Sequence, residues 1–271
     1  MSGHFELQWR GGATEARLHR RRPAAARLPW GTIDLARYGD AVIVDARATW
    51  SHGVFTEYAS AAAFSTLATA LLECGAPVDL TAACADIVVD ELAHVELASR
   101  LTMELGGAVP LAFDLATIAP LTTPGVRPLA RAAELAVTTS VVGEALSVPA
   151  IARARALASE PLVHAILDLL LTDEGPHARL GFWFLDWAAD QLTADERAHL
   201  AELALDALEV YAPLWQDAEG GHDPAGRRAL RAAVVRGIAR PLARHGVALD
   251  ATRLAALLRE QPGQDRTDPR R

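Results

Sequence analysis

Two short segments of the sequence, residues 90–94 and 173–177, share the pattern Asp-Glu-x-x-His. Residues three positions apart lie on the same face of an α-helix, so the glutamate and the histidine of each segment would point the same way. Two such helices facing each other would bring two carboxylates and two imidazoles together, which makes a set of metal ligands. The four candidate ligands are Glu91, His94, Glu174 and His177.

Two isolated glutamates, Glu57 and Glu144, precede these pairs by 34 and 30 residues. Residues 58–72 carry no charge, and Glu144 is the only charged residue within 135–152. An ionised carboxylate on an apolar helix is costly to bury unless it is paired or bound to a metal. Any one of the six residues could instead face solvent or pack in the core. The six residues occur on four predicted helices, and their order favours a metal centre. The order is Glu, Glu-x-x-His, Glu, Glu-x-x-His.

Four carboxylates and two imidazoles form an oxygen-rich ligand set, which suits iron or manganese better than zinc or copper. We expect two iron ions, with a manganese–iron pair as the alternative. Such a site usually activates dioxygen reductively, so O2 is the expected co-substrate. We assign Glu91 and Glu174 as candidate bridges and Glu57 and Glu144 as terminal ligands, with His94 and His177 binding one ion each.

An aspartate, Asp90 or Asp173, directly precedes the glutamate of each pair. A metal-bound histidine usually donates its other ring N–H to a carboxylate or a carbonyl. We therefore predict that Asp90 contacts the histidine of the opposite half and that Asp173 does the reciprocal. The alternative is that both are ordinary surface aspartates.

Four long helices are needed to position these residues, and the sequence predicts an all-α fold. Residues 108–126 are rich in proline and threonine, which excludes a long helix there and predicts a crossover between the second and third helices. The predicted helices are residues 46–74, a second with Asp79 as N-cap that ends at Gly106-Gly107, a third that begins near Pro128, and a fourth over 161–191.

Prolines are predicted to disturb the last two of these helices. Pro149 should kink or break the third helix just beyond Glu144. Gly175-Pro176 should kink the fourth helix, which would leave one side of the metal site open; the alternative is that the helix ends there.

The bundle is expected to be one domain with additions at both ends. Residues 1–45 are predicted to be an irregular arm, with a short strand over 5–9 and a run of arginines that is solvated or binds an anionic partner. Residues 192–261 are predicted to form helices packed on the bundle, opened by caps at Thr193, Asp223 and Asp250. Residues 262–271 are predicted to be disordered.

Composition excludes several classes of protein. The 271 residues have a net charge of −8, so a nucleic-acid-binding role is not expected. We find no apolar run long enough to span a membrane and no signal-peptide core, so a cytoplasmic protein is expected. The two cysteines, Cys74 and Cys84, lack metal-type spacing and are expected to be reduced core residues. A homodimer through the first two helices is also expected.

With these residues in place, residues 46–191 resemble the ferritin-like di-iron carboxylate superfamily. The two Asp-Glu-x-x-His segments resemble those of bacterial multicomponent monooxygenases and ribonucleotide reductase small subunits. Rubrerythrins have a glutamate where this chain has Ser147, and arylamine N-oxygenases have a third histidine where it has Leu170. Aldehyde-deformylating oxygenases are more similar in spacing. The resemblance implies a four-helix bundle and an oxygenase or oxidase.

The leading hypothesis is a non-haem di-iron oxygenase or oxidase that acts on a small organic substrate in specialised metabolism, with electrons from an external donor. It requires an enclosed cavity beside the metals. A ferroxidase or iron-handling protein is the alternative, and a non-catalytic bundle with a relict site is a third. The residues that could border a substrate cavity, or could be plain core, are Phe64, Ile87, Val141 and Leu170.

Overall fold

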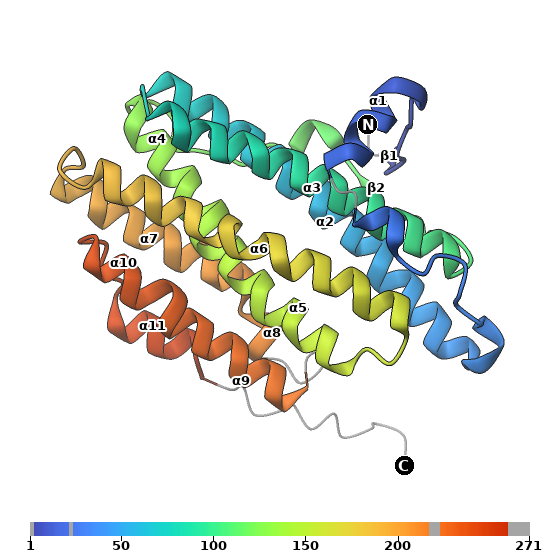
Figure 1. The fold of residues 1–271 in the computed structure, drawn as a ribbon. Coiled ribbons are helices and arrows are strands. Elements are labelled where there is room, and N and C mark those ends of the chain that lie inside the picture. Colours follow the sequence, from blue (N-terminus) through green and yellow to red (C-terminus); the bar gives the residue numbers. More distant parts are fainter. Residues whose placement is uncertain (1–2, 22–23, 217–222, 260–271) are drawn as a thin grey trace, which may run out of the picture.

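The computed structural model describes residues 3–21, 24–216 and 223–259, which are mainly helical (Figure 1). The predicted all-α fold class is therefore confirmed. Within these ranges, β-structure is limited to a two-stranded antiparallel sheet that ties the N-terminal segment to the crossover. Its strands are β1 (Gly3–His4) and β2 (Ala112–Phe113).

Four long helical segments form the centre of the molecule, and each packs against two of the others (Figure 1). The first, α2, packs against α3 and against the third segment, residues 128–157. The fourth, α6, packs against α3 and the third segment. Their bounds are α2 (Asp40–Glu73), α3 (Val78–Glu104), the third segment consisting of α4 (Pro128–Leu135), η4 (Ala136–Glu144) and α5 (Ala145–Leu157), and α6 (Pro161–Ala188).

Glycines in the left-handed region follow the first two long helices. Gly75 has a φ of 70°, and Gly106 has a φ of 103°. Such residues redirect the chain after a helix without a Cβ clash. The prediction of Asp79 as an N-cap is wrong, because Pro77 occupies that position and α3 already begins at Val78. Asp79 lies in the first turn instead, where a negative charge interacts favourably with the helix dipole.

The crossover, residues 105–127, runs along the length of α2. At one end, Arg47 Nε donates to the carbonyl oxygen of Gly107 at 2.7 Å. At the other end, Arg131 pairs with Glu73 at 3.0 Å. Arg47 and Glu73 are roughly 39 Å apart along the axis of α2. The third segment therefore starts where α2 ends and runs antiparallel to it. The crossover also contains η3 (Leu115–Thr117).

Neither proline interrupts its helix. Pro149 lies inside α5, which continues to Leu157, and Pro176 lies inside α6, which continues to Ala188. The predicted break at Pro149 and the alternative end of the fourth helix at Gly175-Pro176 are therefore wrong. The irregularity lies upstream of Pro149, where residues 136–144 form a π-helix that ends at Glu144.

The N-terminal segment is more regular than predicted. It contains α1 (Gly12–Arg21), η1 (Ala25–Arg27) and η2 (Leu35–Arg37), and α2 begins at Asp40 rather than at residue 46. The predicted strand over 5–9 is also wrong, because β1 covers residues 3–4. Tertiary contacts support this segment: α1 packs on α3, and the guanidinium of Arg100 lies 4.0 Å from the ring centre of Trp30.

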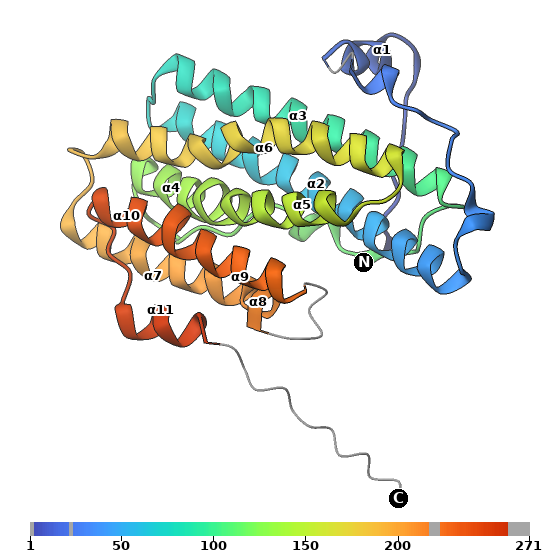
Figure 2. The ribbon, with the colours of Figure 1, turned by 60° about the horizontal axis from the view of Figure 1, so that its bottom comes forward.

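The C-terminal helices form a layer against the third segment (Figure 2). Thr193 and Glu196 form the predicted capping box, and Asp223 and Asp250 are caps as predicted. Residues 262–271 lie outside the described residues. The helices are α7 (Ala194–Tyr211), α8 (Pro213–Gln216), α9 (Pro224–Ala233), the π-helix η5 (Val234–Ala239), α10 (Arg240–Arg244) and α11 (Ala251–Leu257).

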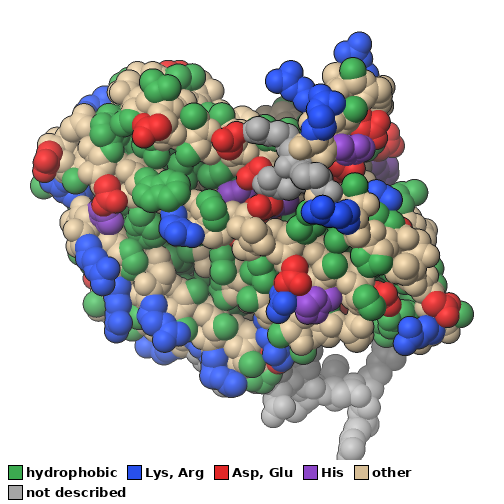
Figure 3. All heavy atoms as spheres, viewed as in Figure 1, with side chains coloured by type: hydrophobic (Ala, Val, Ile, Leu, Met, Phe, Trp, Pro, Cys, Tyr) green, Lys and Arg blue, Asp and Glu red, His purple; other side chains and the backbone are tan. Residues whose placement is uncertain are grey.

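The third segment, Pro128–Leu157, is long and apolar enough to cross a membrane by length and composition alone. The expectation that no run has this length is therefore wrong. The most apolar window is 44% buried inside the protein, and the segment packs against α2, α6 and α7. This is how the central helix of a bundle behaves. The face in Figure 3 carries both acidic and basic side chains among apolar ones.

Candidate metal centre

The structure brings all six predicted ligands together inside the bundle. Glu57 comes from α2, Glu91 and His94 from α3, Glu144 from the last position of the π-helix, and Glu174 and His177 from α6. Within α3 and α6, the three-residue spacing places each glutamate and histidine on the same inward face. They form two clusters, each with ligand atoms within 4.8 Å of one another: Glu57, Glu91, His94 and Glu174; and Glu91, Glu144, Glu174 and His177.

Glu91 and Glu174 belong to both clusters. A carboxylate has two oxygens, so one glutamate can bind an ion on either side. This sharing is the geometry expected of two bridging carboxylates between adjacent metal positions. Each remaining cluster member belongs to one position only: Glu57 and His94 to the first position, and Glu144 and His177 to the second.

The cluster is buried, with one more open side. Relative exposure is 1% for Glu91, 2% for Glu174 and 7% for Glu144, whereas the side chain of Glu57 is 18% exposed. The two imidazoles are fully buried and lie 5.9 Å apart between ring centroids. Burying four carboxylates is unfavourable unless positive charge compensates them, so this arrangement requires bound cations or protons.

Each histidine points its Nδ1 atom into the cluster. His94 Nδ1 lies 3.3 Å from Glu57 Oε2 and 3.7 Å from both Glu91 and Glu174. His177 Nδ1 lies 2.9 Å from Glu91 Oε1 and 3.7 Å from Glu174 Oε2. Neither Nδ1 atom has a hydrogen bond of acceptable geometry, and neither does Glu91 Oε1. Buried polar atoms rarely lack partners, and one metal ion in each cluster would satisfy all three.

The Nε2 atoms of the histidines point outward to the two aspartates. His94 Nε2 lies 3.1 Å from Asp173 Oδ2, and His177 Nε2 lies 3.5 Å from Asp90 Oδ2. Each aspartate therefore contacts the histidine of the opposite half. Such a contact holds the ring orientation and keeps the proton on Nε2, which leaves Nδ1 free to bind a metal.

Without a metal ion, the histidines respond to the surrounding carboxylates. Burial acts to lower the pKa of His177, but the contacts with Asp90, Glu174 and Glu91 outweigh it and raise that pKa to about 11. The pKa of His94 is also raised well above its ordinary value, because Asp173, Glu57 and Glu91 outweigh its burial. The rings then compensate part of the buried negative charge.

The glutamates divide into two types. Burial raises the pKa of Glu57 to about 8 and raises the pKa of Glu144 well above its ordinary value, with the Glu174 charge adding to the effect at Glu144. Burial also disfavours the charge of Glu91, but contacts with His177 and His94 prevail and lower its pKa to about 2. The central carboxylate of Glu91 is thus the more strongly ionised.

Two serines, neither of which was predicted to contact the ligands, bind glutamates that come from other helical segments. Ser60 Oγ donates to Glu144 Oε1 at 2.9 Å, and Ser147 Oγ lies 2.9 Å from Glu174 Oε2. Each serine lies three residues after an isolated glutamate, Glu57 or Glu144. This repeated Glu-x-x-Ser spacing is a signal from which the serines could have been identified.

A third serine connects the π-helix to α6. Ser140 Oγ donates to the carbonyl oxygen of His177 at 2.6 Å and accepts from the amide of Gly181 at 2.8 Å. The Ser140 hydroxyl therefore lies between the His177 carbonyl and the Gly181 amide, which would hydrogen-bond to each other in a regular α-helix. Gly181 permits this approach, because a Cβ there would lie 2.6 Å from a methyl carbon of Val141 and 2.7 Å from the carbonyl oxygen of Ala136.

The apolar residues proposed to border a substrate cavity are core residues. Phe64, Ile87, Val141 and Leu170 are all 4% exposed or less and belong to packed hydrophobic clusters. The Phe64 ring lies 6.0 Å from the His177 ring, between centroids, so this core directly covers the ligands. One cavity between α4 and α7 and another between α1 and α3 are lined by none of the six ligands.

The residues present fit a pair of first-row transition ions. The donors are carboxylate oxygens and imidazole nitrogens without thiolates, a set that suits iron and manganese. Comparison with known proteins finds no matching family model, no matching curated protein and no matching solved structure. The function is therefore argued from the site itself.

Proposed function

We propose that the protein is a ferritin-like di-iron carboxylate protein, an O2-dependent oxidoreductase that oxidises a small organic molecule. The observation that carries the proposal is the sharing of Glu91 and Glu174 between two clusters that each add one glutamate and one histidine. The antiparallel third segment, reached by a crossover along α2, supports the bundle topology that such a site uses.

A carboxylate-bridged iron pair would supply reductive activation of dioxygen. Glu91 and Glu174 would bridge the two positions, and Glu57 and Glu144 would complete the ligand set at the outer ends. Asp90 and Asp173 hold the imidazoles with Nδ1 inward. The apolar shell around Phe64 covers the His177 side of the site. Electrons would come from a separate donor.

The direct test is elemental analysis of the purified protein, followed by the optical spectrum after addition of Fe(II) and oxygen. We expect about two iron ions per chain and an oxo-bridge absorption band. Glu91→Ala should reduce the iron content to a small fraction of this. Absence of iron after anaerobic reconstitution of the wild-type protein would contradict the proposal.

A ferroxidase is the second candidate, and the packed core around the ligands favours it. An oxygenase needs room for an organic substrate, whereas Fe(II) itself needs only a path to the ligands. The more exposed Glu57 lies at one end of the cluster. Oxygen consumption during repeated Fe(II) additions separates the candidates: a ferroxidase turns over many iron ions per chain, and an oxygenase stops after its site is filled.

A further inference from the structure

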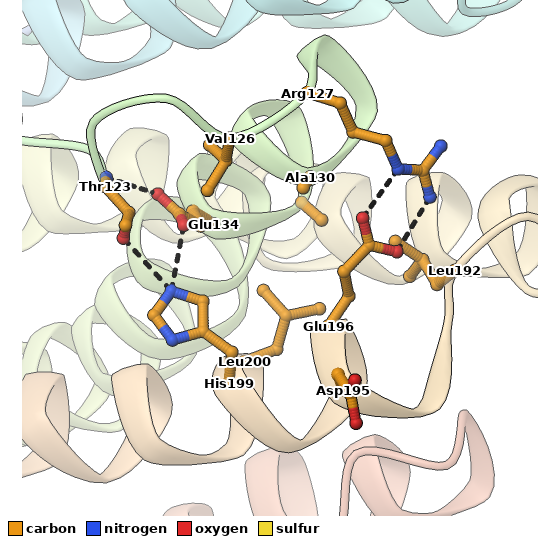
Figure 4. Close-up of a pocket in the computed structure, with 11 residues that line it drawn as sticks. Thr123, Val126, Arg127, Ala130, Glu134, Leu192, Asp195, Glu196, His199 and Leu200 are labelled. Carbon is orange, nitrogen blue, oxygen red and sulfur yellow. Dashed lines mark hydrogen bonds and ion pairs between the residues drawn. The ribbon is translucent and has the colours of Figure 1, made fainter.

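A cavity of about 290 Å³ lies between α4, the end of the crossover and the start of α7 (Figure 4). An apolar cavity of roughly 150 Å³ already accommodates benzene. Much of the lining is hydrophobic, with Val126, Ala130, Ala133, Leu192 and Leu200. Such a space, apolar with a few polar groups, is typical of a small-molecule site.

The polar end of the cavity is built around Glu134, a carboxylate that is only 3% exposed. Its Oε2 accepts from the amide of Thr123 at 2.8 Å, and its Oε1 lies 2.9 Å from His199 Nε2. Thr123 Oγ1 lies 3.0 Å from the same nitrogen. Because an ionised carboxylate only accepts, Nε2 carries the hydrogen. A catalytic triad would place acid and hydroxyl on opposite ring nitrogens, so this cluster is not one.

The opposite side of the cavity carries an ion pair in which the guanidinium of Arg127 is already paired with Glu196 (Figure 4). Arg127 Nε and Nη2 bind the two oxygens of Glu196 at 2.6 and 2.7 Å, and Nη2 also donates to the carbonyl oxygen of Gln191. The charged lining residues are Arg127, Glu134, Asp195 and Glu196. Three carboxylates therefore face one guanidinium and one imidazole, so the lining has an excess of acidic groups.

We propose that this cavity binds a small organic cation, a primary ammonium carried on a short apolar body. The apolar body would contact Val126, Ala130 and Leu200, and the ammonium would donate to Glu134. A carboxylate can accept about four hydrogen bonds, so Glu134 can take a ligand without losing Thr123 or His199.

This site is separate from the candidate metal centre. Glu134 and Glu144 are ten positions apart on the same helical segment, roughly two turns or more along its axis. A molecule bound at Glu134 would therefore not reach the metal ligands. The proposal does not depend on the proposed function, and metal-free protein can be used to test it.

The test is isothermal titration calorimetry of the full-length protein with hexylammonium, hexanol and hexanoate, which share an apolar body and differ in charge. Hexylammonium should bind at one site per chain, roughly tenfold or more tighter than hexanol, and hexanoate should bind more weakly still. Glu134→Gln should reduce the affinity for hexylammonium to that for hexanol. Ala130→Leu should weaken all binding by filling the cavity.

Glu202→Gln is the matched control, because Glu202 is an exposed acid on α7 outside the cavity. It should leave hexylammonium binding unchanged. Circular dichroism checks that each variant folds. If Glu134→Gln does not fold, the affinities of the three ligands for the wild-type protein and for Ala130→Leu still test the proposal. Equal affinity for hexylammonium and hexanoate, no binding of hexylammonium, or binding unaffected by Ala130→Leu would each overturn the proposal.

Discussion

At the scale of single residues, each histidine of the candidate centre is held from two sides. The aspartate on Nε2 fixes the ring, and the carboxylates face Nδ1. Each aspartate contacts the histidine of the other Asp-Glu-x-x-His segment, so neither segment is complete without the other. The geometry therefore couples α3 and α6 through side chains as well as through packing.

The first prediction concerns Asp173. Asp173→Asn should weaken Mn(II) binding by roughly 10–100-fold, because the amide is a poorer acceptor for the His94 ring N–H and no longer fixes it. Calorimetric titration with Mn(II) measures the change. Asp45→Asn, at an exposed position of α2, is the control. Equal affinity of Asp173→Asn and wild-type protein would show that Asp173 is only a surface residue.

The second prediction concerns Glu196, whose pKa is lowered to about 2, chiefly by Arg127. A lowered folded-state pKa means that the stabilisation is present above the unfolded pKa near 4.5 and is lost as the pH falls toward 2. Glu196→Gln keeps the capping geometry and removes the charge. It should destabilise the protein by about 0.5–1 kcal/mol at pH 7. Urea unfolding at pH 7, 4.5 and 3 should show this difference shrinking; a constant difference would contradict the mechanism.

At the scale of elements, the π-helix and α6 approach each other closely beside the site. Ser140 and Gly181 let the two backbones approach, and His177 and Glu144 lie on these two helices. Wider π turns are frequent at functional sites because they re-aim side chains. Here the π-helix ends at Glu144, so it sets the position of that ligand.

The third prediction concerns Gly181. Gly181→Ala should destabilise the protein by about 1–3 kcal/mol, because the new Cβ would overlap Val141 and the carbonyl oxygen of Ala136. Gly53→Ala is the matched control, since Gly53 lies inside α2 with open space around its Cβ position. It should stabilise by about 0.5–1 kcal/mol. Urea unfolding measures both, and equal effects would show that the close approach is relaxed at little cost.

Sequence patterns predicted the elements that rest on local chemistry. Three-residue spacing identified the ligand pairs, prolines identified the crossover, and the Thr193 capping box fixed the start of α7. The π-helix was not predicted; its Ser140 bonds to backbone groups of α6, a tertiary interaction that local sequence patterns do not show. The N-terminal helix α1 was missed because its sequence is short and strongly polar, and its contacts with α3 are tertiary.

At the scale of the whole molecule, the candidate centre joins all four long segments. Each segment contributes at least one ligand, so a bound metal pair would tie the bundle together at its middle. Without metal, the buried Nδ1 atoms and Glu91 Oε1 lack hydrogen bonds, which reduces stability. Metal binding and the stability of the fold are therefore linked.

The fourth prediction is that metal stabilises the folded protein. Mn(II) at about 100 times its Kd should add about 2.7 kcal/mol for each ion bound, and one bound ion should raise the Tm by roughly 5–10 °C. Differential scanning calorimetry with and without a chelator measures the shift. Glu91→Ala should lose it, because both metal positions share that carboxylate. A similar shift in this variant would indicate that the metal binds elsewhere.

The C-terminal layer makes the surroundings of the two candidate metal positions unequal, although their residue types are alike. Helix α7 packs on the π-helix beside Glu144, where the Tyr211 hydroxyl lies near Gly143, and Ser60 also holds Glu144. Glu57 is the more exposed outer ligand of the pair. Ions should therefore enter and leave in a fixed order, with exchange fastest at the Glu57 position and the Glu144 position retaining its ion longest.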